Sequence, residues 1–269
     1  MSSLHDRLEY FYKVRNYIRQ KRKEKKNTNV FNLLKRVELS ETQGKFSETY
    51  TGYLDNIPVL VKIVPSKDLD TFPHPDLIKN EPAMKKTYDE IIATRFKIRQ
   101  VIYNKFCPSF VLLYHTEPLS KFEYTNPYLK YKNYNSSIIM VFELYDITLK
   151  KWCMTKFIKL KDEQKDKKML NILMNIWITL GCLYNLLKKT HNDLHWDNIM
   201  LKYNNNNGYN LYKINNVKYY IPTVGFNVYI IDFGKVEELT YDSHNRKENK
   251  MDLQRIHTLY YWLQSKLGL

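Results

Sequence analysis

Two periodicities divide the chain. From Leu4 to Lys26, and again from Met169 to Lys189, apolar residues recur at the three- and four-residue spacing of one helical face. From Val37 to Val64, β-branched and aromatic residues alternate with polar ones around Gly44, Gly52 and Asp55-Asn56. This middle stretch predicts three antiparallel strands joined by turns.

Further strands are predicted from Phe110 to Tyr114 and from Ile138 to Leu144, with a loop rich in Tyr, Lys and Asn (119–137) between them. The charged stretch 159–168 is interpreted as a surface loop or helix end, and 203–227 as an insertion, either a lid or a harmless expansion. A final helix is expected over 251–267, with one apolar face formed by Leu253, Ile256, Leu259, Leu263 and Leu267. Strands followed by helices predict an α+β fold.

Charge narrows the classes of partner. The chain has 269 residues, of which 43% are hydrophobic, and its 43 Lys and Arg against 28 Asp and Glu give a net charge of +15. Such a balance suits anionic partners, namely nucleotides, nucleic acid or acidic protein surfaces, although solubility alone also explains it. The basic run Lys21–Lys26 favours a solvated helix end over a nucleic-acid contact.

Cysteine use and hydropathy bear on location. The cysteines are odd in number and follow no metal-binding pattern, which favours a reducing compartment: Cys107, Cys153 and Cys182. The charged N-terminus predicts no signal peptide, and the most apolar stretch, 172–187, is interrupted by polar residues and short for a bilayer. We therefore expect no membrane association and an intracellular location, in the cytoplasm of a host or producing cell, with the nucleus or a virion as alternatives.

Two motifs carry candidate chemistry. The first runs from His191 to Asn198, where Asp193 can meet a substrate hydroxyl and Asn198, five positions later, can bind a metal ion. The second follows an apolar strand: Asp232 stands just before Phe233-Gly234, where a bare carboxylate can bridge Mg²⁺ to nucleotide phosphates. In this order and spacing the two motifs indicate phosphoryl transfer.

Simpler interpretations compete with this one. His191 and His195 stand four apart and could ligate zinc, but the H-E-x-x-H pattern requires Glu where Asn192 stands. Asp193 and Asp232 could each be an ordinary turn residue. The ordered pair of motifs makes a double coincidence the weaker interpretation.

These residues resemble the protein-kinase-like superfamily, whose catalytic loop is H-x-D-x-x-x-x-N and whose metal motif is D-F-G. Val59-Leu60-Val61-Lys62 is similar to the V-A-I-K strand, although Leu60 replaces its small Ala. Only one glycine of the G-x-G-x-x-G loop, Gly44, is present.

The resemblance implies ATP and Mg²⁺ as cofactors and a role for each matching residue. Asp193 would orient or deprotonate the acceptor hydroxyl, Asn198 and Asp232 would hold Mg²⁺, and Lys62 would hold phosphates. The nucleotide site would also include Gly44, Glu143, Tyr145 and Met200.

The glutamate that should pair with Lys62 has two candidates. Pro82 belongs in a first helical turn and would leave Glu81 at the very end, whereas Glu90 lies inside the helix. We therefore expect Glu90 to pair with Lys62.

The chain departs from the family at several points. Asn192 replaces the Arg through which phosphorylation switches many protein kinases, and His195 replaces the Lys that contacts the γ-phosphate. Asp-Leu-His instead looks like haspin-like protein kinases and like aminoglycoside and choline phosphotransferases, and the insertions are similar to those of kinases of large DNA viruses. There is no A-P-E sequence, and 35 residues after Gly234 are few for a full second lobe. Asp252 is expected to replace the buried Asp that braces the catalytic loop, accepting backbone N–H groups near His191.

The resulting prediction is a two-lobed kinase-like fold with a basic N-terminal helical extension (1–36), a β-rich N-lobe (37–144) and a reduced helical C-lobe (145–269). The expected activity is that of an ATP-dependent protein kinase, Ser/Thr-specific, acting on a protein substrate that can be acidic. A small-molecule phosphotransferase and a pseudokinase scaffold are the alternatives.

Overall fold

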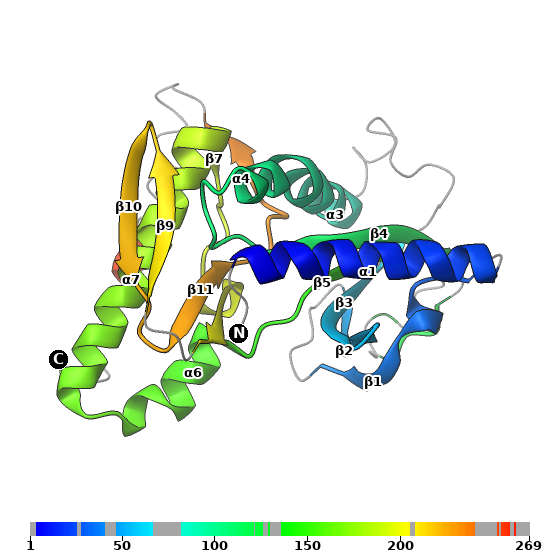
Figure 1. Cartoon of the computed structure of the whole chain (residues 1–269), viewed down its shortest axis with the longest axis horizontal. Coiled ribbons are helices and arrows are strands. Elements are labelled where there is room, and N and C mark those ends of the chain that lie inside the picture. Colours follow the sequence, from blue (N-terminus) through cyan, green and yellow to red (C-terminus); the bar gives the residue numbers. More distant parts are fainter. Residues whose placement is uncertain are drawn as a thin grey trace. The chain divides into compact units, whose positions relative to one another are not determined.

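The computed structural model describes residues 4–25, 28–40, 47–66, 82–120, 122–125, 129, 136–204, 208–239, 252, 254–258 and 261. The chain is α+β and forms two compact units (Figure 1). The sheet unit comprises His5–Ile91 and Leu112–Leu144, and the helical unit comprises Met1–Leu4, Ile92–Val111 and Tyr145–Leu269. Gly44 and Glu81, both named from the sequence, lie outside the described residues.

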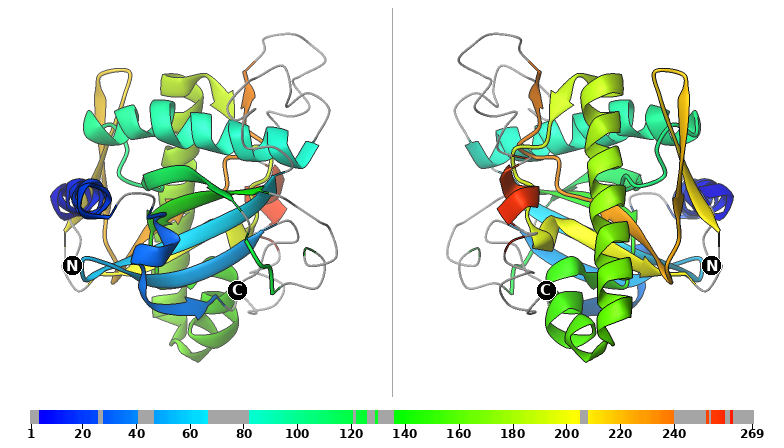
Figure 2. Two further views of the ribbon diagram at one scale, coloured as in Figure 1. Left: turned by 90° about the vertical axis from the view of Figure 1, so that its right-hand side faces the viewer. Right: turned by 90° about the vertical axis from the view of Figure 1, so that its left-hand side faces the viewer.

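The sheet unit is built on one antiparallel sheet of strand order β1-β2-β3-β5-β4 (Figure 2). Its strands are β1 (Lys35–Leu39), β2 (Glu48–Leu54), β3 (Ile57–Ser66), β4 (Leu113–Ser120) and β5 (Ser136–Glu143). The three strands predicted between Val37 and Val64 are confirmed as β1 to β3, and β2 and β3 are joined by Asp55-Asn56, both at positive φ (49° and 63°). Two such residues in a two-residue loop match the right-handed twist of the paired strands.

The fourth strand differs from its prediction. It begins at Leu113 and runs to Ser120, whereas 110–114 was expected to form the strand and 119–137 the loop. The second half of β4 could not be predicted from the apolar pattern, because it contains the polar residues His115 and Glu117. Pro118 is tolerated in this strand because β4 lies at the edge of the sheet. Glu117 is buried there because it receives Arg22, His115 and the backbone N–H of Val30.

The expected N-terminal helix is confirmed as α1 (Leu4–Glu24), which from His5 onward belongs to the sheet unit. Its inner face carries Phe11, Val14 and Ile18, all at most 2% exposed, and Phe11 meets Tyr114 of β4 edge to face. In the basic run, Lys21 pairs with Glu24 and Arg22 with Glu117. A short 3₁₀ turn, η1 (Phe31–Leu33), follows.

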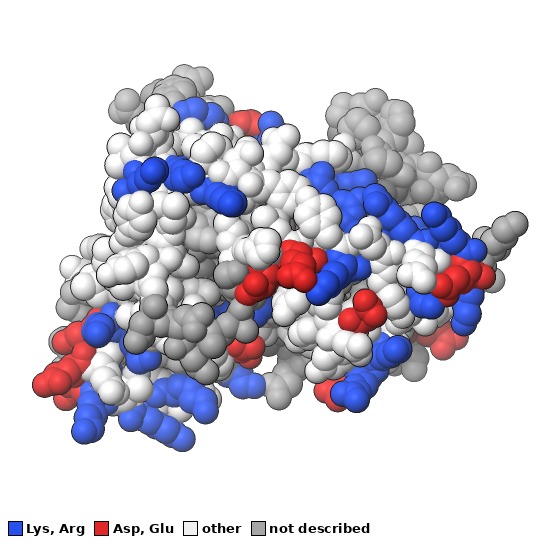
Figure 3. Space-filling model, in the orientation of Figure 1, with Lys and Arg blue, Asp and Glu red and all other residues white. Residues whose placement is uncertain are grey.

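A continuous helical run then comprises α3 (Pro82–Ile92), the π-helical η2 (Ala93–Ile98) and α4 (Arg99–Tyr103). The division between the two units falls within this run, after Ile91. On the face drawn in Figure 3, basic side chains are more prominent than acidic ones, in keeping with the net charge of +15.

The helical unit is organised on α7 (Asp162–Leu187), which follows α6 (Leu149–Thr155) and η3 (Phe157–Lys159). The helix predicted from Met169 exists but begins at Asp162, so the stretch 159–168 is mostly helix. Its first turns are too polar to show an apolar period, yet Asp162 and Glu163 stabilise a helix N-terminus through the macrodipole.

Small sheets complete this unit. β6 (Ile147–Thr148), β8 (Ile199–Tyr203) and β11 (Phe226–Ile230) form one sheet of order β11-β8-β6, and β7 (Lys189–Thr190) pairs with β12 (Glu237–Glu238). The turn η4 (Trp196–Asn198) leads into β8.

The insertion 203–227 contains a β-hairpin that the sequence interpretation lacked. β9 (Tyr209–Ile214) and β10 (Val217–Pro222) are joined by Asn215-Asn216 at positive φ. The hairpin packs on α7 (Figure 2): Tyr212 is fully buried and donates to Asn175, and a Cβ on Gly181 would lie 3.2 Å from Ile214. Glycine therefore permits this close approach.

By length and composition α7 is the one helix among the described residues that could cross a membrane. Its packing on β9 and β11 and its buried polar residues Asn171, Asn175 and Thr179 are typical of a core helix. All three cysteines of the chain are buried in this same unit, and burial raises the pKa of the Cys153 thiol to about 12.

Candidate active site

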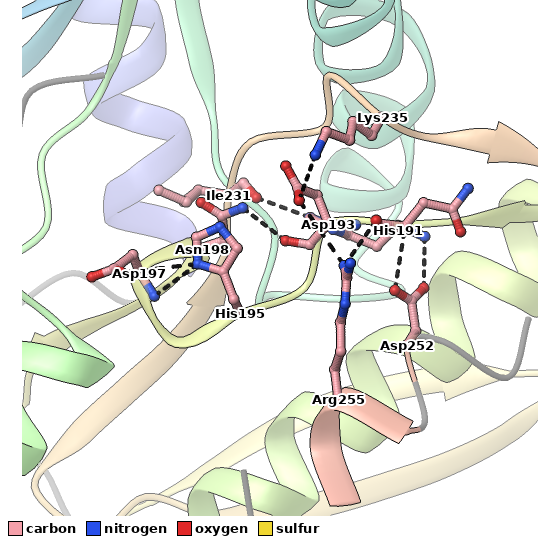
Figure 4. Close-up of polar contacts among 10 residues, drawn as sticks. His191, Asp193, His195, Asp197, Asn198, Ile231, Lys235, Asp252 and Arg255 are labelled. Atoms are coloured by element: carbon pink, nitrogen blue, oxygen red, sulfur yellow. Dashed lines mark hydrogen bonds and ion pairs between the residues drawn. The ribbon is translucent and has the colours of Figure 1, made fainter. Parts of the chain in front are cut away.

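The loop from His191 to Asn198 holds its own polar groups in place (Figure 4). The Asn198 Nδ2 donates to the backbone oxygen of Asp193 at 2.9 Å, and the Asn198 backbone N–H donates to His195 O at 2.8 Å. With its nitrogen used in this way, the Asn198 amide offers its Oδ1 as the atom for a cation. The loop thus fixes Asn198 relative to Asp193.

His191 connects this loop to the segment that carries Asp232. Its Nε2 lies 2.9 Å from Ile231 O, and the Asp193 N–H points to its Nδ1 at 3.3 Å. These partners assign the neutral tautomer with the proton on Nε2. Complete burial lowers the pKa of His191, against opposing effects of Asp252, the Ile231 carbonyl, Asp232 and Asp193, so the ring remains neutral.

Asp232 directly follows this connection. Ile231 N–H donates to Asn198 O at 3.0 Å, and Asp232 itself adopts a left-handed backbone conformation with φ of 59°. A non-glycine residue in that region is strained and persists only where its surroundings determine it. Phe233 supplies the anchor: it is fully buried and meets the rings of Phe110 and His191.

Asp252 braces the loop from below, as the sequence predicted. Its carboxylate accepts the backbone N–H of His191 at 2.8 Å and that of Asn192 at 3.0 Å, and also the Tyr184 hydroxyl at 3.1 Å. Asp252 is completely buried, and Asn192 has φ of 59°. Burial, with the neighbouring Asp252, raises the pKa of Tyr184 and keeps it a donor. Of the predicted apolar face, Ile256 is described and buried, whereas Leu253, Leu259, Leu263 and Leu267 lie outside the described residues.

Two cations face the Asp193 carboxylate. Lys235 Nζ lies 2.8 Å from Asp193 Oδ1, and Arg255 Nη1 lies 4.0 Å from the same oxygen while donating to Asn192 O at 2.8 Å (Figure 4). Sequence reasoning missed both. Lys235 directly follows the D-F-G motif, which was the available signal.

In the sheet unit, the ion pair expected between Lys62 and Glu90 is present. Lys62 Nζ lies 2.7 Å from Glu90 Oε2, with side-chain exposures of 21% and 5%. Lys62 stands in β3, opposite Thr49 of β2 and Met140 of β5, and Glu90 comes from α3. A half-buried ammonium in an apolar strand requires such an anionic partner.

Glu143 has a partner that the sequence interpretation missed. Its carboxylate receives Arg7 Nε at 2.8 Å, and both side chains are 1% exposed. The Glu143 backbone N–H donates to Leu112 O. Arg7 occupies the apolar face of α1, one turn before Phe11, and a charge on that face was the one signal that a buried partner exists.

The remaining predicted nucleotide contacts lie in the helical unit. Tyr145 is buried and packs against Tyr229, with ring centroids 4.6 Å apart and ring planes tilted by 36°. Met200 is half-buried in β8, opposite Tyr229 of β11 and Thr148 of β6. The helical unit therefore gathers Asp193, Asn198 and Asp232 on one connected loop system, while the sheet unit holds the Lys62–Glu90 pair.

The metal options differ in their fit. Among the described residues there is no group of three or more His, Cys, Asp and Glu that could hold a metal ion, and Nε2 of the buried His191 is hydrogen-bonded to Ile231 O. Asn198 Oδ1 and the Asp232 carboxylate would offer two hard oxygen ligands, which suits Mg²⁺, an ion that usually completes its shell with waters and phosphates.

Comparison with known proteins adds no assignment: no protein-family model matches the chain, and no curated protein matches it.

Proposed function

We propose that the chain is an ATP-dependent protein kinase with a two-lobed kinase-like fold, in which the sheet unit is the N-lobe and the helical unit the C-lobe. One observation carries the proposal: Asp193, Asn198 and the residue before Asp232 are hydrogen-bonded into one braced loop system. A set of unrelated turn carboxylates would have no reason to share such bracing. The Lys62–Glu90 pair supports it independently.

The chain's own residues divide the work. Asp193 accepts a hydrogen bond from the acceptor hydroxyl and orients its oxygen, and Lys62, positioned by Glu90, binds phosphate oxygens. Asn198 and Asp232 would hold Mg²⁺, which supplies charge neutralisation at the phosphates when bound. Asp252 positions the loop through the backbone of His191 and Asn192.

Purified protein incubated with radiolabelled ATP, Mg²⁺, casein and a panel of amino-alcohols tests the class of activity. Label on casein alone supports a protein kinase, and label on an amino-alcohol supports a small-molecule phosphotransferase. Label on neither, with no hydrolysis of ATP, supports a scaffold.

Asp193→Asn is expected to lower the rate of phosphotransfer by about 10²- to 10⁴-fold, because it removes the group assigned to the acceptor hydroxyl. Mg-ATP affinity, measured by calorimetry, should change little. A rate within a few fold of wild type removes Asp193 from the mechanism.

Asp232→Ala is expected to weaken Mg-dependent ATP binding as well as turnover, because an anionic metal ligand is lost. Calorimetric titration with and without Mg²⁺ separates this from Asp193→Asn. Unchanged Mg-ATP affinity in a folded Asp232→Ala protein would mean that Asp232 is a structural turn residue.

A further inference from the structure

Lys235 is an exposed lysine that pairs with a nearly buried carboxylate of the 191–198 loop. It lies at the turn after Gly234, its side chain is 54% exposed, and it nevertheless reaches Asp193 Oδ1 at 2.8 Å. Asp193 is 13% exposed, so the ammonium enters from the solvent side of a nearly buried carboxylate. Lys150, by contrast, pairs with Asp197 at 3.1 Å, with both side chains exposed.

His195, the basic residue of the 191–198 loop itself, already has a hydrogen-bond partner within the loop. His195 Nδ1 accepts the Asp197 N–H at 3.3 Å and so caps η4. This hydrogen bond makes His195 a local cap within the loop. The position at which the resemblance places a phosphate-binding lysine therefore holds a ring that is already bonded to its own loop.

Arg255 is also constrained. Its Nη1 donates to Asn192 O, and it stands 4.0 Å from Asp193 Oδ1. Lys235 has a flexible four-carbon stem and a compact charge, and can exchange one anion for another at little cost.

We propose that Lys235 is a catalytic residue that contacts the phosphoryl group during its transfer, an inference that rests on the proposed function. The acceptor oxygen must lie within hydrogen-bond distance of Asp193 and close to the γ-phosphorus, so an ammonium bonded to Asp193 lies within reach of the γ-phosphate oxygens. Before substrates bind, Lys235 neutralises Asp193; with both substrates bound, it shifts to the phosphoryl oxygens.

In the step itself, the acceptor oxygen forms a bond to the γ-phosphorus as the bond from that phosphorus to the β,γ-bridging oxygen breaks. The electron pair of the broken bond goes to ADP, and the acceptor proton passes to Asp193. Negative charge spreads over the three equatorial oxygens, where a preorganised cation stabilises the transition state more than the ground state.

The test compares three variants of the full chain: Lys235→Ala, Lys235→Arg, and Lys150→Ala as a control that removes an exposed ion pair of the same loop outside Asp193. Each is assayed with ATP and Mg²⁺ on a serine peptide with neutral flanks, on the same peptide with flanking aspartates, and with water as acceptor. Thermal melts check that each variant is folded.

We expect Lys235→Ala to lower kcat by about 10²-fold with all three acceptors, while the KM for ATP changes little. Lys235→Arg, which keeps the charge, should recover most of the loss, and Lys150→Ala should match wild type.

A loss confined to the aspartate-flanked peptide would overturn the proposal and make Lys235 an acceptor-selecting residue. A Lys235→Ala rate equal to that of Lys150→Ala would also overturn it. If the wild-type protein transfers phosphate to none of the three acceptors, the proposed function itself fails, which is a different outcome from an active wild type with an unaffected Lys235→Ala.

Discussion

Asp252 of the helical unit and Glu143 of the sheet unit are both buried carboxylates, but they are neutralised in different ways. Asp252 accepts two backbone N–H groups and a tyrosine hydroxyl, whereas Glu143 receives the guanidinium of Arg7, which is itself 1% exposed. The first arrangement distributes one charge over neutral donors, and the second buries two charges together. The two arrangements therefore respond differently to the loss of one partner. Removing the Asp252 carboxylate leaves backbone N–H groups without their acceptor, whereas removing Arg7 takes a cation away from a buried carboxylate.

The largest effect on stability is expected for Arg7→Ala. The variant removes the Arg7 guanidinium from the buried Glu143 carboxylate, which should lower the free energy of unfolding by about 3–5 kcal/mol. Urea denaturation measures it. The matched control is Arg7→Met with Glu143→Leu, which removes both charges and should be far closer to wild type. If the double variant is as unstable as Arg7→Ala, the pair acts through packing and the contrast with Asp252 disappears.

A smaller effect is expected for Asp252→Ala. It leaves the His191 and Asn192 N–H groups without their acceptor, at a cost of about 1–3 kcal/mol, and should also lower kcat because the loop that positions Asp193 loosens. Thermal melts and initial rates are measured together, with Mg-ATP affinity as the property that should remain. A folded Asp252→Ala protein with wild-type turnover would reduce Asp252 to a helix cap.

The smallest effect concerns pH. Because burial lowers the pKa of His191, the unfolded chain takes up a proton on this residue as pH falls through about 6.5, and the folded chain does not. The contribution of His191 to stability should therefore be level above this pH and should fall below it by up to about 1.4 kcal/mol per pH unit. Urea midpoints at several pH values, compared with those of His191→Gln, isolate this contribution. Equal pH slopes in both proteins would exclude it.

The sequence predicted the Asp252 contact and not the Arg7–Glu143 pair, for physical reasons. Asp252 stands at the start of an apolar-periodic helix beside a recognised loop, so its possible partners were few. Arg7 and Glu143 are 136 positions apart, and each has an ordinary local explanation, as a helix residue and as a strand end. Nothing in a single sequence pairs two such residues.

Some helices and turns could likewise be predicted from the sequence, whereas one hairpin could not. The helix carrying Glu90 and the turn at Asp55-Asn56 could be predicted because Pro82 and the turn residues have fixed backbone preferences. The β9–β10 hairpin could not be recognised, because Asn215-Asn216 stands in a stretch where asparagine is abundant everywhere and loses its value as a turn signal. The Lys235 contact depends on where a turn delivers a side chain, which residue spacing does not encode.

The positions of the buried cysteines allow unfolding of the helical unit to be followed separately by thiol labelling. All three lie in the helical unit, and none occurs in the sequence of the sheet unit. A thiol reagent can react only when the surrounding core separates, because a buried thiol is not accessible to it. The rate of alkylation at Cys107, Cys153 and Cys182 therefore reports how often the helical unit opens, and it does not respond to opening of the sheet unit, which has no cysteine.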